Sequence, residues 1–371
     1  MVFIGTCGTA LEDISPNIAR GMTTAWKPTA VSFSSGGVRI IGHIGVLAHL
    51  LETGDLSNVR DWYGCSGGTI TAILAGLGVT PIWLRDFVTH FNPRVFADIE
   101  DDAVFSYLNV WGVNTGKGLI SFMGRLMDAW EPGSSAWTFA DFVTHRPGVT
   151  LNITSANISK GVLAIFNHIH TPSMKIVDAM RVSSTIPLFF TPWYDPSGDI
   201  YCDGAVMEYY PWTCLKDKEN TLVVVCSDTG ISGRKPSQES IKTLWDYFGT
   251  LVACARRQRF TETPKHWIAV NNSVVGILDF DISQADRLAF FEEGIRAAKG
   301  WRAFRDSIKR DSASRTHKCS GDRGLPCASC VARCSPNNKM DSPGSHSPAP
   351  EQHSSQDPQT SRPRASRRWS L

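Results

Sequence analysis

The chain has 371 residues, 42% of them hydrophobic and 19% charged, so it is long enough and apolar enough to bury a large core. Its 37 basic and 35 acidic residues leave a formal net charge of +2, which argues against nucleic acid as the main partner. The sequence contains no apolar run of about 18 residues, the length of a membrane-spanning helix, and it opens without the basic and apolar regions of a secretory signal. We therefore expect a cytoplasmic protein.

The first elements expected along the chain are a strand, a glycine turn and a helix. Residues 1–29 show little periodicity and are interpreted as an N-terminal extension. Residues 30–34 form the first expected strand, and the turn Ser35-Gly36-Gly37 ends it. Apolar residues then recur at helical spacing over residues 40–51, which predicts a helix with one buried face.

The same unit occurs a second time. Residues 61–63 lead into the turn Gly64-Cys65-Ser66-Gly67-Gly68, and apolar residues then recur at helical spacing over residues 70–77. Two successive strand, turn and helix units are typical of a parallel sheet, because each helix carries the chain back to the start of the next strand.

Strands and helices continue to alternate through the body of the chain. Residues 81–145 carry aromatic side chains at helical spacing, which favours core packing, with an acyl-chain groove as the alternative. Further strands are expected at residues 149–154, 162–166, 200–201 and 222–225, and residues 236–310 are mainly helical in pattern. The alternation predicts an α/β fold, a three-layer α/β/α sandwich around a mostly parallel sheet.

The composition changes near residue 311. The last 61 residues contain 13 Ser and 7 Pro and a single aromatic residue, too little apolar surface to offset the chain entropy of folding. The expected organisation is an N-terminal extension (1–29), a core (30–215), a helical continuation of the same domain (216–310) and a disordered tail (311–371).

The tail carries a cluster of possible zinc ligands. Its members are His317, Cys319, Cys327, Cys330 and Cys334. Cys-x-x-Cys is a zinc-ligand spacing, but a structural site usually has a second such pair, which is missing here. Unpaired thiols in a flexible tail are the alternative, and four arginines near the C-terminus are interpreted as solvated.

The turn around Ser66 matches the pattern G-x-S-x-G of a nucleophile elbow. In such an elbow a tight turn between strand and helix lifts the serine oxygen out of the sheet. Side chains at Gly64 or Gly68 would collide with the neighbouring strand or helix, and the helix directs the positive end of its dipole at the nucleophile. The alternative is a packing turn with an inert serine.

The earlier glycine turn, which continues into Val38 and Arg39, also stands between a strand and a helix. The free backbone N–H groups of Gly36 and Gly37 can hold either a phosphate or the oxyanion of an acyl-transfer intermediate. No Lys-Ser/Thr pair follows the glycines, which weakens the nucleotide alternative. Arg39 is a candidate for holding the loop or contacting a lipid phosphate, with a plain surface arginine as the alternative.

A serine nucleophile needs a base, and the sequence Asp203-Gly204-Ala205 offers one. It ends a short expected strand, so Asp203 is a candidate for pointing into the same cleft as Ser66. Because Asp-Gly is a common turn, a purely structural role is the alternative.

Taken together, these motifs resemble the patatin-like phospholipases, a family of serine acyl hydrolases. The resemblance lies in Ser35-Gly36-Gly37-Val38-Arg39, in Gly64-Cys65-Ser66-Gly67-Gly68, in Arg181-Val182-Ser183-Ser184-Thr185-Ile186-Pro187-Leu188-Phe189-Phe190 and in Asp203-Gly204-Ala205, and covers about residues 30–215. The family's glycine loop usually reads G-G-G-x-R-G, whereas this chain has Ser35 at the first position and Ile40 at the last.

The resemblance implies a Ser-Asp dyad with Ser66 as nucleophile and Asp203 as base, and an oxyanion hole at Gly36 and Gly37. It implies no catalytic histidine, no cofactor and no bound metal. The expected substrate is a phospholipid or another acyl-ester lipid, met during transient contact with a membrane surface.

Two alternatives remain open at this point. One is a conventional Ser-His-Asp hydrolase, for which His266 is the candidate because it follows the acid in the chain. The other is a lipid-binding or scaffold protein that keeps the fold without useful turnover, which the altered glycine loop motivates.

Overall fold

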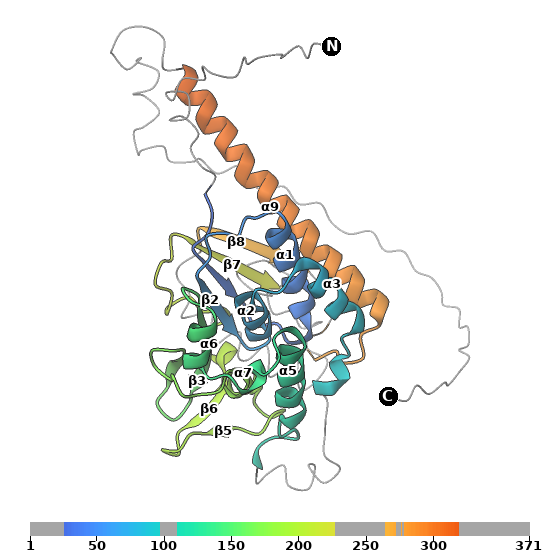
Figure 1. The fold of residues 1–371 in the computed structure, drawn as a ribbon, viewed down its shortest axis with the longest axis vertical. Helices are drawn as coiled ribbons and strands as arrows, with labels where there is room; N and C mark the ends of the chain where they lie inside the picture. The colour runs from blue at the N-terminus through green and yellow to red at the C-terminus, as the bar shows by residue number, and fades with distance from the viewer. Residues whose placement is uncertain (1–25, 97–109, 227–263, 272–275, 277, 319–371) are drawn as a thin grey trace, which may run out of the picture. The chain divides into compact units, whose positions relative to one another are not determined.

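A computed structural model describes residues 26–96, 110–226, 264–271, 276 and 278–318, with side chains up to residue 307 (Figure 1). The predicted N-terminal extension up to residue 25 lies outside the described residues. The same holds for the tail after residue 318, and so for the four cysteines of the predicted zinc cluster.

The described strands form one sheet in the order β5-β6-β3-β2-β1-β7-β8, with β4 paired to β3. The strands are β1 (Ala30–Phe33), β2 (Asp61–Cys65), β3 (Thr150–Asn157), β4 (Val162–Phe166), β5 (Trp193–Tyr194), β6 (Ile200–Asp203), β7 (Thr221–Cys226) and β8 (His266–Val270). The pairs from β3 through β2, β1 and β7 to β8 are parallel, whereas β4, β5 and β6 pair antiparallel. The predicted α/β fold around a mostly parallel sheet is confirmed.

Helices flank this sheet. They are α1 (Ile40–Glu52), α2 (Gly68–Leu77), α3 (Pro81–His90), α5 (Lys117–Trp130), α6 (Phe139–His145), α7 (Ile176–Ser183) and α9 (Gln284–Lys318). Local sequence sets several of their ends: Thr80 caps α3 ahead of Pro81, and Thr138 and Asp141 form a capping box on α6. The last turn of α2 ends at Gly78, which adopts φ 75° as only glycine does readily.

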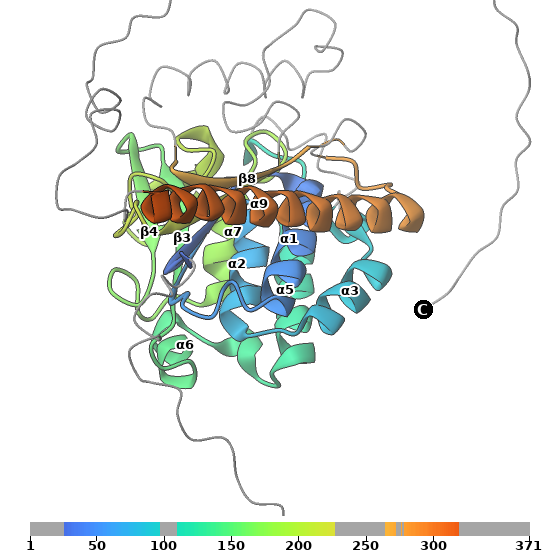
Figure 2. The ribbon, with the colours of Figure 1, turned by 90° about the horizontal axis from the view of Figure 1, so that it is seen from above.

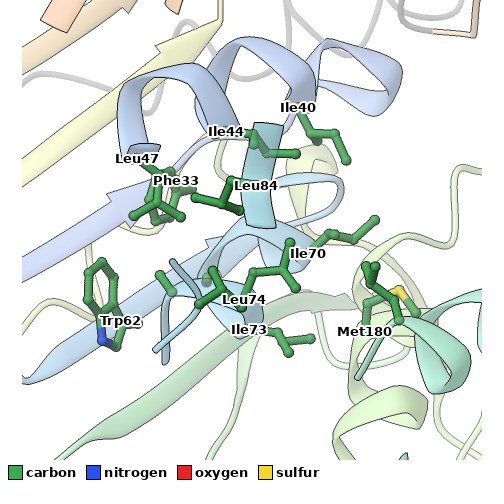
Figure 3. Close-up of a cluster of buried hydrophobic side chains, with 14 of the residues drawn as sticks. Phe33, Ile40, Ile44, Leu47, Trp62, Ile70, Ile73, Leu74, Leu84 and Met180 are labelled. Atoms are coloured by element: carbon green, nitrogen blue, oxygen red, sulfur yellow. The ribbon is translucent and has the colours of Figure 1, made fainter. Parts of the chain in front are cut away.

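The main core lies between one face of the sheet and the helices (Figure 3). Alternate strand residues such as Phe33 and Trp62 point to this face, because side chains alternate along a strand. They meet apolar residues of α1, α2, α3 and α7, among them Ile44, Leu74 and Met180. Four aromatic residues of the 81–145 region, Phe87, Phe91, Phe96 and Phe122, pack on one another in this core, whereas Trp111 of the same region is half exposed.

A smaller cluster covers the opposite face. Tyr63, Val223 and Val225 point to it from the strands, and Tyr210 and Trp212 pack onto them. The covering chain in the described ranges is thus the irregular stretch that follows η5 (Gly204–Val206). Strand β7 contributes apolar side chains to both clusters, which explains why its sequence is a continuous apolar run. Such a run predicted a central strand, and β7 lies between β1 and β8.

The C-terminal part of the domain differs from expectation in two ways. Residues 266–270 form the strand β8, although the surrounding region is helical in pattern, because a run of five residues after Pro264 suits a short strand beside β7. The helix α9 continues to Lys318, eight residues into the stretch expected to be disordered, and the sequence has no Gly or Pro there to end it.

Helix α9 crosses α1 at very short distance (Figure 2). A Cβ at Gly45 would lie 2.1 Å from the carbonyl oxygen of Phe291, and a Cβ at Gly294 would lie 2.2 Å from that of Gly42. The buried carboxylate of Asp55 adds ion pairs of 2.6 Å to Arg302 and 2.7 Å to Arg305. Close packing therefore joins the two helices, and ion pairs join α9 to the turn after α1. Among the described helices, none has the length and apolarity needed to cross a bilayer.

Candidate active site

Strand register brings two distant motifs end to end. Cys65, the last residue of β2, pairs with Thr154 of β3, and the next residue of β3, Ser155, pairs with Asp203 of β6. Strand β4 already occupies the other edge of β3 at these positions, so β2 and β6 share one edge. The end of β6 therefore meets the end of β2, where the elbow turn begins.

Ser66 and Asp203 are in direct contact at this junction. The Ser66 hydroxyl donates to Oδ2 of Asp203 at 2.5 Å, and the two residues are only 2% and 4% exposed. Ser66 has φ 53°, a left-handed conformation that costs energy for a residue with a side chain and that is typical of strained functional turns. Two side chains 137 positions apart in the sequence thus form a buried hydrogen-bonded pair.

Two hydrogen bonds to backbone groups hold Asp203 on its other side. Oδ1 of Asp203 accepts from the Ala205 amide at 2.8 Å, and the Asp203 amide donates to the Thr185 carbonyl at 2.8 Å. Burial, with the Asp203 charge as a smaller cause, raises the pKa of the neighbouring Cys202 thiol to about 12, so this thiol stays protonated.

The three motif glycines are required for space. A Cβ at Gly64 would lie 2.5 Å from the Thr69 Cα, one at Gly68 would lie 2.3 Å from the Ser34 carbonyl oxygen, and one at Gly204 would lie 2.7 Å from the Thr154 carbonyl oxygen. Contacts this short do not occur, so a side chain at any of the three would push strand, elbow and helix apart.

The glycine loop lies directly against the elbow. Gly37 has φ 55°. A Cβ at Gly67 would lie 2.8 Å from the carbonyl oxygen of Gly37 and 3.0 Å from the nitrogen of Gly37. The Ser35 amide donates to the Tyr209 carbonyl at 2.7 Å, so this N–H is engaged and the candidate oxyanion donors are those of Gly36 and Gly37. Ile40, which departs from the family pattern, is fully buried with its Cγ2 atom 2.7 Å from that same Cβ position.

Arg39 ends the short helix η2 (Gly37–Arg39) and is half-buried. Its amide donates to the Gly36 carbonyl at 3.0 Å, and its carbonyl accepts from the Cys226 thiol at 3.2 Å. The backbone of Arg39 thus closes the glycine loop. A role of its guanidinium in lipid phosphate binding stays a prediction.

Sequence reasoning missed several residues that support this site. The Ser183 hydroxyl accepts from the Ser66 amide at 2.8 Å and donates to the Thr154 carbonyl at 2.7 Å, which ties the elbow to α7 and β3. Arg181, almost fully buried, donates to the Thr185 hydroxyl at 2.6 Å and to the Thr115 carbonyl at 3.0 Å. Both residues fall in the stretch 181–190 that carries the resemblance, so the signal was present without a role attached to it.

The structure does not bring His266 to the dyad. His266 pairs with Leu222, which pairs with Val31 and through it with Trp62, so it lies three strands from β2 and level with a residue four positions before Ser66. Three strand spacings amount to about 14 Å. His266 instead stacks on Trp26, with ring centroids 3.7 Å apart. Within the described ranges, no three His, Cys, Asp or Glu residues gather as a metal site would need.

Comparison with known proteins gives a family and distant relatives. The family model described as patatin-like phospholipase matches residues 31–214. The uncharacterized protein R571 of Acanthamoeba polyphaga mimivirus is 22% identical over 72% of this chain and 92% of its own length. The probable lipid hydrolase 463L of Invertebrate iridescent virus 6 is 26% identical over 48% of this chain and 60% of its own.

Among solved structures, that of VipD from Legionella pneumophila aligns with a TM-score of 0.49 at 14% identity. The alignment covers 79% of this chain and 73% of that one.

Proposed function

Since the chain belongs, through residues 31–214, to the patatin-like phospholipase family, we propose that it is a lipid hydrolase. Its substrates are phospholipids or related acyl lipids, whose carboxylic ester bonds it cleaves. Ser66 is the nucleophile, Asp203 is the base, and the amides of Gly36 and Gly37 stabilise the oxyanion. The relative 463L, described as a probable lipid hydrolase, agrees with this chemistry.

Acylation starts from the hydrogen bond between the two side chains. Asp203 Oδ2 takes the proton of the Ser66 hydroxyl while the oxygen attacks the ester carbonyl carbon. The negative charge that develops on the carbonyl oxygen needs preorganised donors, and the glycine loop next to the elbow supplies backbone N–H groups. When the carbon–oxygen bond of the ester breaks, Asp203 returns the proton to the leaving alcohol.

Deacylation reverses these roles with water. Asp203 takes a proton from a water molecule whose oxygen attacks the acyl carbon, and the bond to the Ser66 oxygen breaks. Asp203 then returns the proton to Ser66. The sum is one ester and one water converted to one carboxylic acid and one alcohol, with no other reactant.

The contact between the Ser66 hydroxyl and Asp203 Oδ2 carries the proposal. It joins a serine in a strained turn to a carboxylate, and both are buried, so each is shielded from the water that would weaken their interaction. A packing turn with an inert serine has no need of left-handed backbone at Ser66 or of a buried carboxylate beside it.

The proposal is tested by ester hydrolysis with wild type and Ser66→Ala. The substrates are a short-chain nitrophenyl ester and a mixed phospholipid vesicle. Ser134→Ala is the matched control, because Ser134 is also buried but its hydroxyl lacks a partner among the described residues. We expect Ser66→Ala to lose at least about 10⁴-fold in kcat, and Ser134→Ala to stay within about twofold of wild type.

A folded wild type that is inert on both substrates would contradict the proposal. If it still bound the vesicles, the lipid-binding alternative would take its place. Activity that survives in Ser66→Ala would show that another residue is the nucleophile.

A further inference from the structure

A buried histidine that the mechanism does not use lies behind the glycine loop. His43 is on the first turn of α1 and is 0% exposed. Its Nε2 atom is 3.3 Å from the Ser34 hydroxyl, and its ring lies against Phe33 with centroids 5.6 Å apart. Ser34, which His43 contacts, lies two positions before Gly36, the first of the candidate oxyanion donors.

The hydrogen bonds of Ser34 determine which atoms donate. The hydroxyl donates to the Ser35 carbonyl at 2.9 Å, and since that carbonyl can only accept, this bond uses the single hydroxyl hydrogen. The amide of Cys226 donates to the same hydroxyl at 3.4 Å. His43 Nε2 can therefore bond to it only as a donor, with its own hydrogen on Nε2.

The environment of the ring agrees with this neutral tautomer. Burial lowers the pKa of His43 to about 3, so the ring carries one hydrogen at neutral pH. Nδ1 has no hydrogen-bond partner among the described residues, as suits a nitrogen without a hydrogen, because a buried donor left unpaired is rarer than a buried acceptor.

The consequence for the loop follows from the planarity of the peptide bond. The Ser35 carbonyl and the Gly36 N–H belong to one trans peptide and point in opposite directions. Fixing the carbonyl toward the Ser34 hydroxyl therefore fixes the direction of the Gly36 N–H. The next peptide is held in the same way, because the Gly36 carbonyl accepts from the Arg39 amide and so orients the Gly37 N–H.

We propose that His43 is a positioning residue for the oxyanion hole: its Nε2–H holds the Ser34 hydroxyl, which holds the Ser35 carbonyl and thereby aims the Gly36 N–H. This inference rests on the proposed function, since the aimed amide matters for catalysis only if an oxyanion forms. His43 itself does not touch substrate.

The test is the kinetics of His43→Leu and Ser34→Ala on the nitrophenyl ester. Loss of an oxyanion donor costs about 10² to 10³ in rate, and a misaimed one costs less, so we expect kcat to fall by roughly 10- to 100-fold with KM within about twofold. The double variant is expected to be no slower than the slower single variant, because both break the same chain. His43→Gln, whose amide nitrogen reaches the place of Nε2, is expected to restore most of the rate.

His49→Leu is the matched control. His49 is a second buried histidine of α1, near its other end, and it faces Glu52 and Asp55 rather than the loop. We expect it to keep the kcat of wild type. Ser34→Ala is a smaller change than His43→Leu, so it still decides the matter if His43→Leu does not fold.

Nitrogen NMR of the histidine rings gives a readout that does not depend on activity. The expected spectrum of the full chain shows His43 as the neutral Nε2–H tautomer; an Nδ1–H tautomer would overturn the inference. An active wild type whose His43→Leu and Ser34→Ala variants keep full kcat would also overturn it and leave the proposed function intact. A wild type inert on both substrates would remove the proposed function, and the inference with it.

Discussion

Two histidines lie in two different regions of the domain and differ in burial and in neighbours. His43 lies under the glycine loop at the end of the sheet where β2 and β6 meet, next to Phe33. His266 lies on β8, the last strand of the sheet in the described ranges, and stacks on Trp26. Chain order alone favours His266 as the catalytic candidate, because it follows Asp203 as a triad histidine would.

Strand register decides which of these residues can contact Ser66. His266 is level with Trp62 near the start of β2 and three strands away from it, whereas Asp203 reaches Ser66 because β3 extends three residues past its pairing with β2 and pairs with β6 there. His266, which follows Asp203 in the chain, is therefore outside the site, whereas His43, which precedes Ser66, lies next to the residue that leads into the glycine loop.

Changing Asp203 is expected to lower kcat far more than changing His266. Asp203→Asn keeps the shape of the side chain but removes the carboxylate that we propose as the base, and we expect kcat to fall by about 10³-fold or more. His266→Ala should stay within about twofold of wild type, because it does not touch the dyad. Steady-state ester hydrolysis measures both, and the reverse pattern would favour a Ser-His-Asp hydrolase.

The second prediction concerns how tightly the region around Ser66 is packed. Gly68→Ala would bring a methyl group 2.3 Å from the Ser34 carbonyl oxygen, and we expect a loss of about 3 kcal/mol in the free energy of unfolding. Gly124→Ala, inside α5 and 3.4 Å from its nearest neighbour, should be neutral or gain up to about 1 kcal/mol. Denaturant titration measures the free energy of unfolding of both variants. Equal values would mean that the region around Ser66 has room for a methyl group at Gly68.

A third prediction uses the pH dependence of stability. Burial lowers the pKa of His43 from 6.5, the value of a solvated histidine, to about 3 in the folded protein. Between these two pH values the unfolded chain therefore binds more protons than the folded one. The contribution of neutral His43 is therefore fully present above pH 6.5 and is lost as the pH falls toward 3, by up to about 1.4 kcal/mol per pH unit.

His43→Gln should remove this part of the slope. Burial also lowers the pKa of His266, so it acts in the same direction, and His266→Gln should flatten the curve less because that ring is only partly buried. An unchanged slope in His43→Gln would mean that the imidazole is already solvated in the folded state.

The smallest expected effect is the stability contribution of His266. Its stacking on Trp26 predicts a loss of about 1 kcal/mol in His266→Ala. A double-mutant cycle with Trp26→Ala isolates the contact, and a coupling of zero would show that the stack contributes nothing.

Much of the fold could be predicted because its signals are local. Apolar periodicity predicted α1 and α2, and the β-branched run predicted β7. Glycines marked two turns, the one that precedes α1 and the one that contains Ser66. The resemblance to the patatin-like phospholipases likewise implied Ser66 and Asp203 as a pair, and the two side chains are in contact.

The rest depends on contacts between distant segments. Ser183 and His43 support the site only through register and packing, which a single sequence does not display. Gly67 looks interchangeable in the pattern G-x-S-x-G, yet the neighbouring Gly37 and Ile40 leave no room for a side chain. The pattern did not predict strand β8, because five residues without clear alternation resemble part of a helix.

Covalent labelling distinguishes an activated serine from the other serines of the chain. An alkyl fluorophosphonate forms a bond from a serine oxygen to phosphorus and releases fluoride, and it reacts rapidly only with an activated serine. Mass spectrometry of the full chain is expected to find one label, on Ser66. Asp203→Asn should slow the labelling strongly, and His266→Ala should leave its rate unchanged. A label on another serine, or equal rates in wild type and Asp203→Asn, would contradict the Ser66–Asp203 dyad.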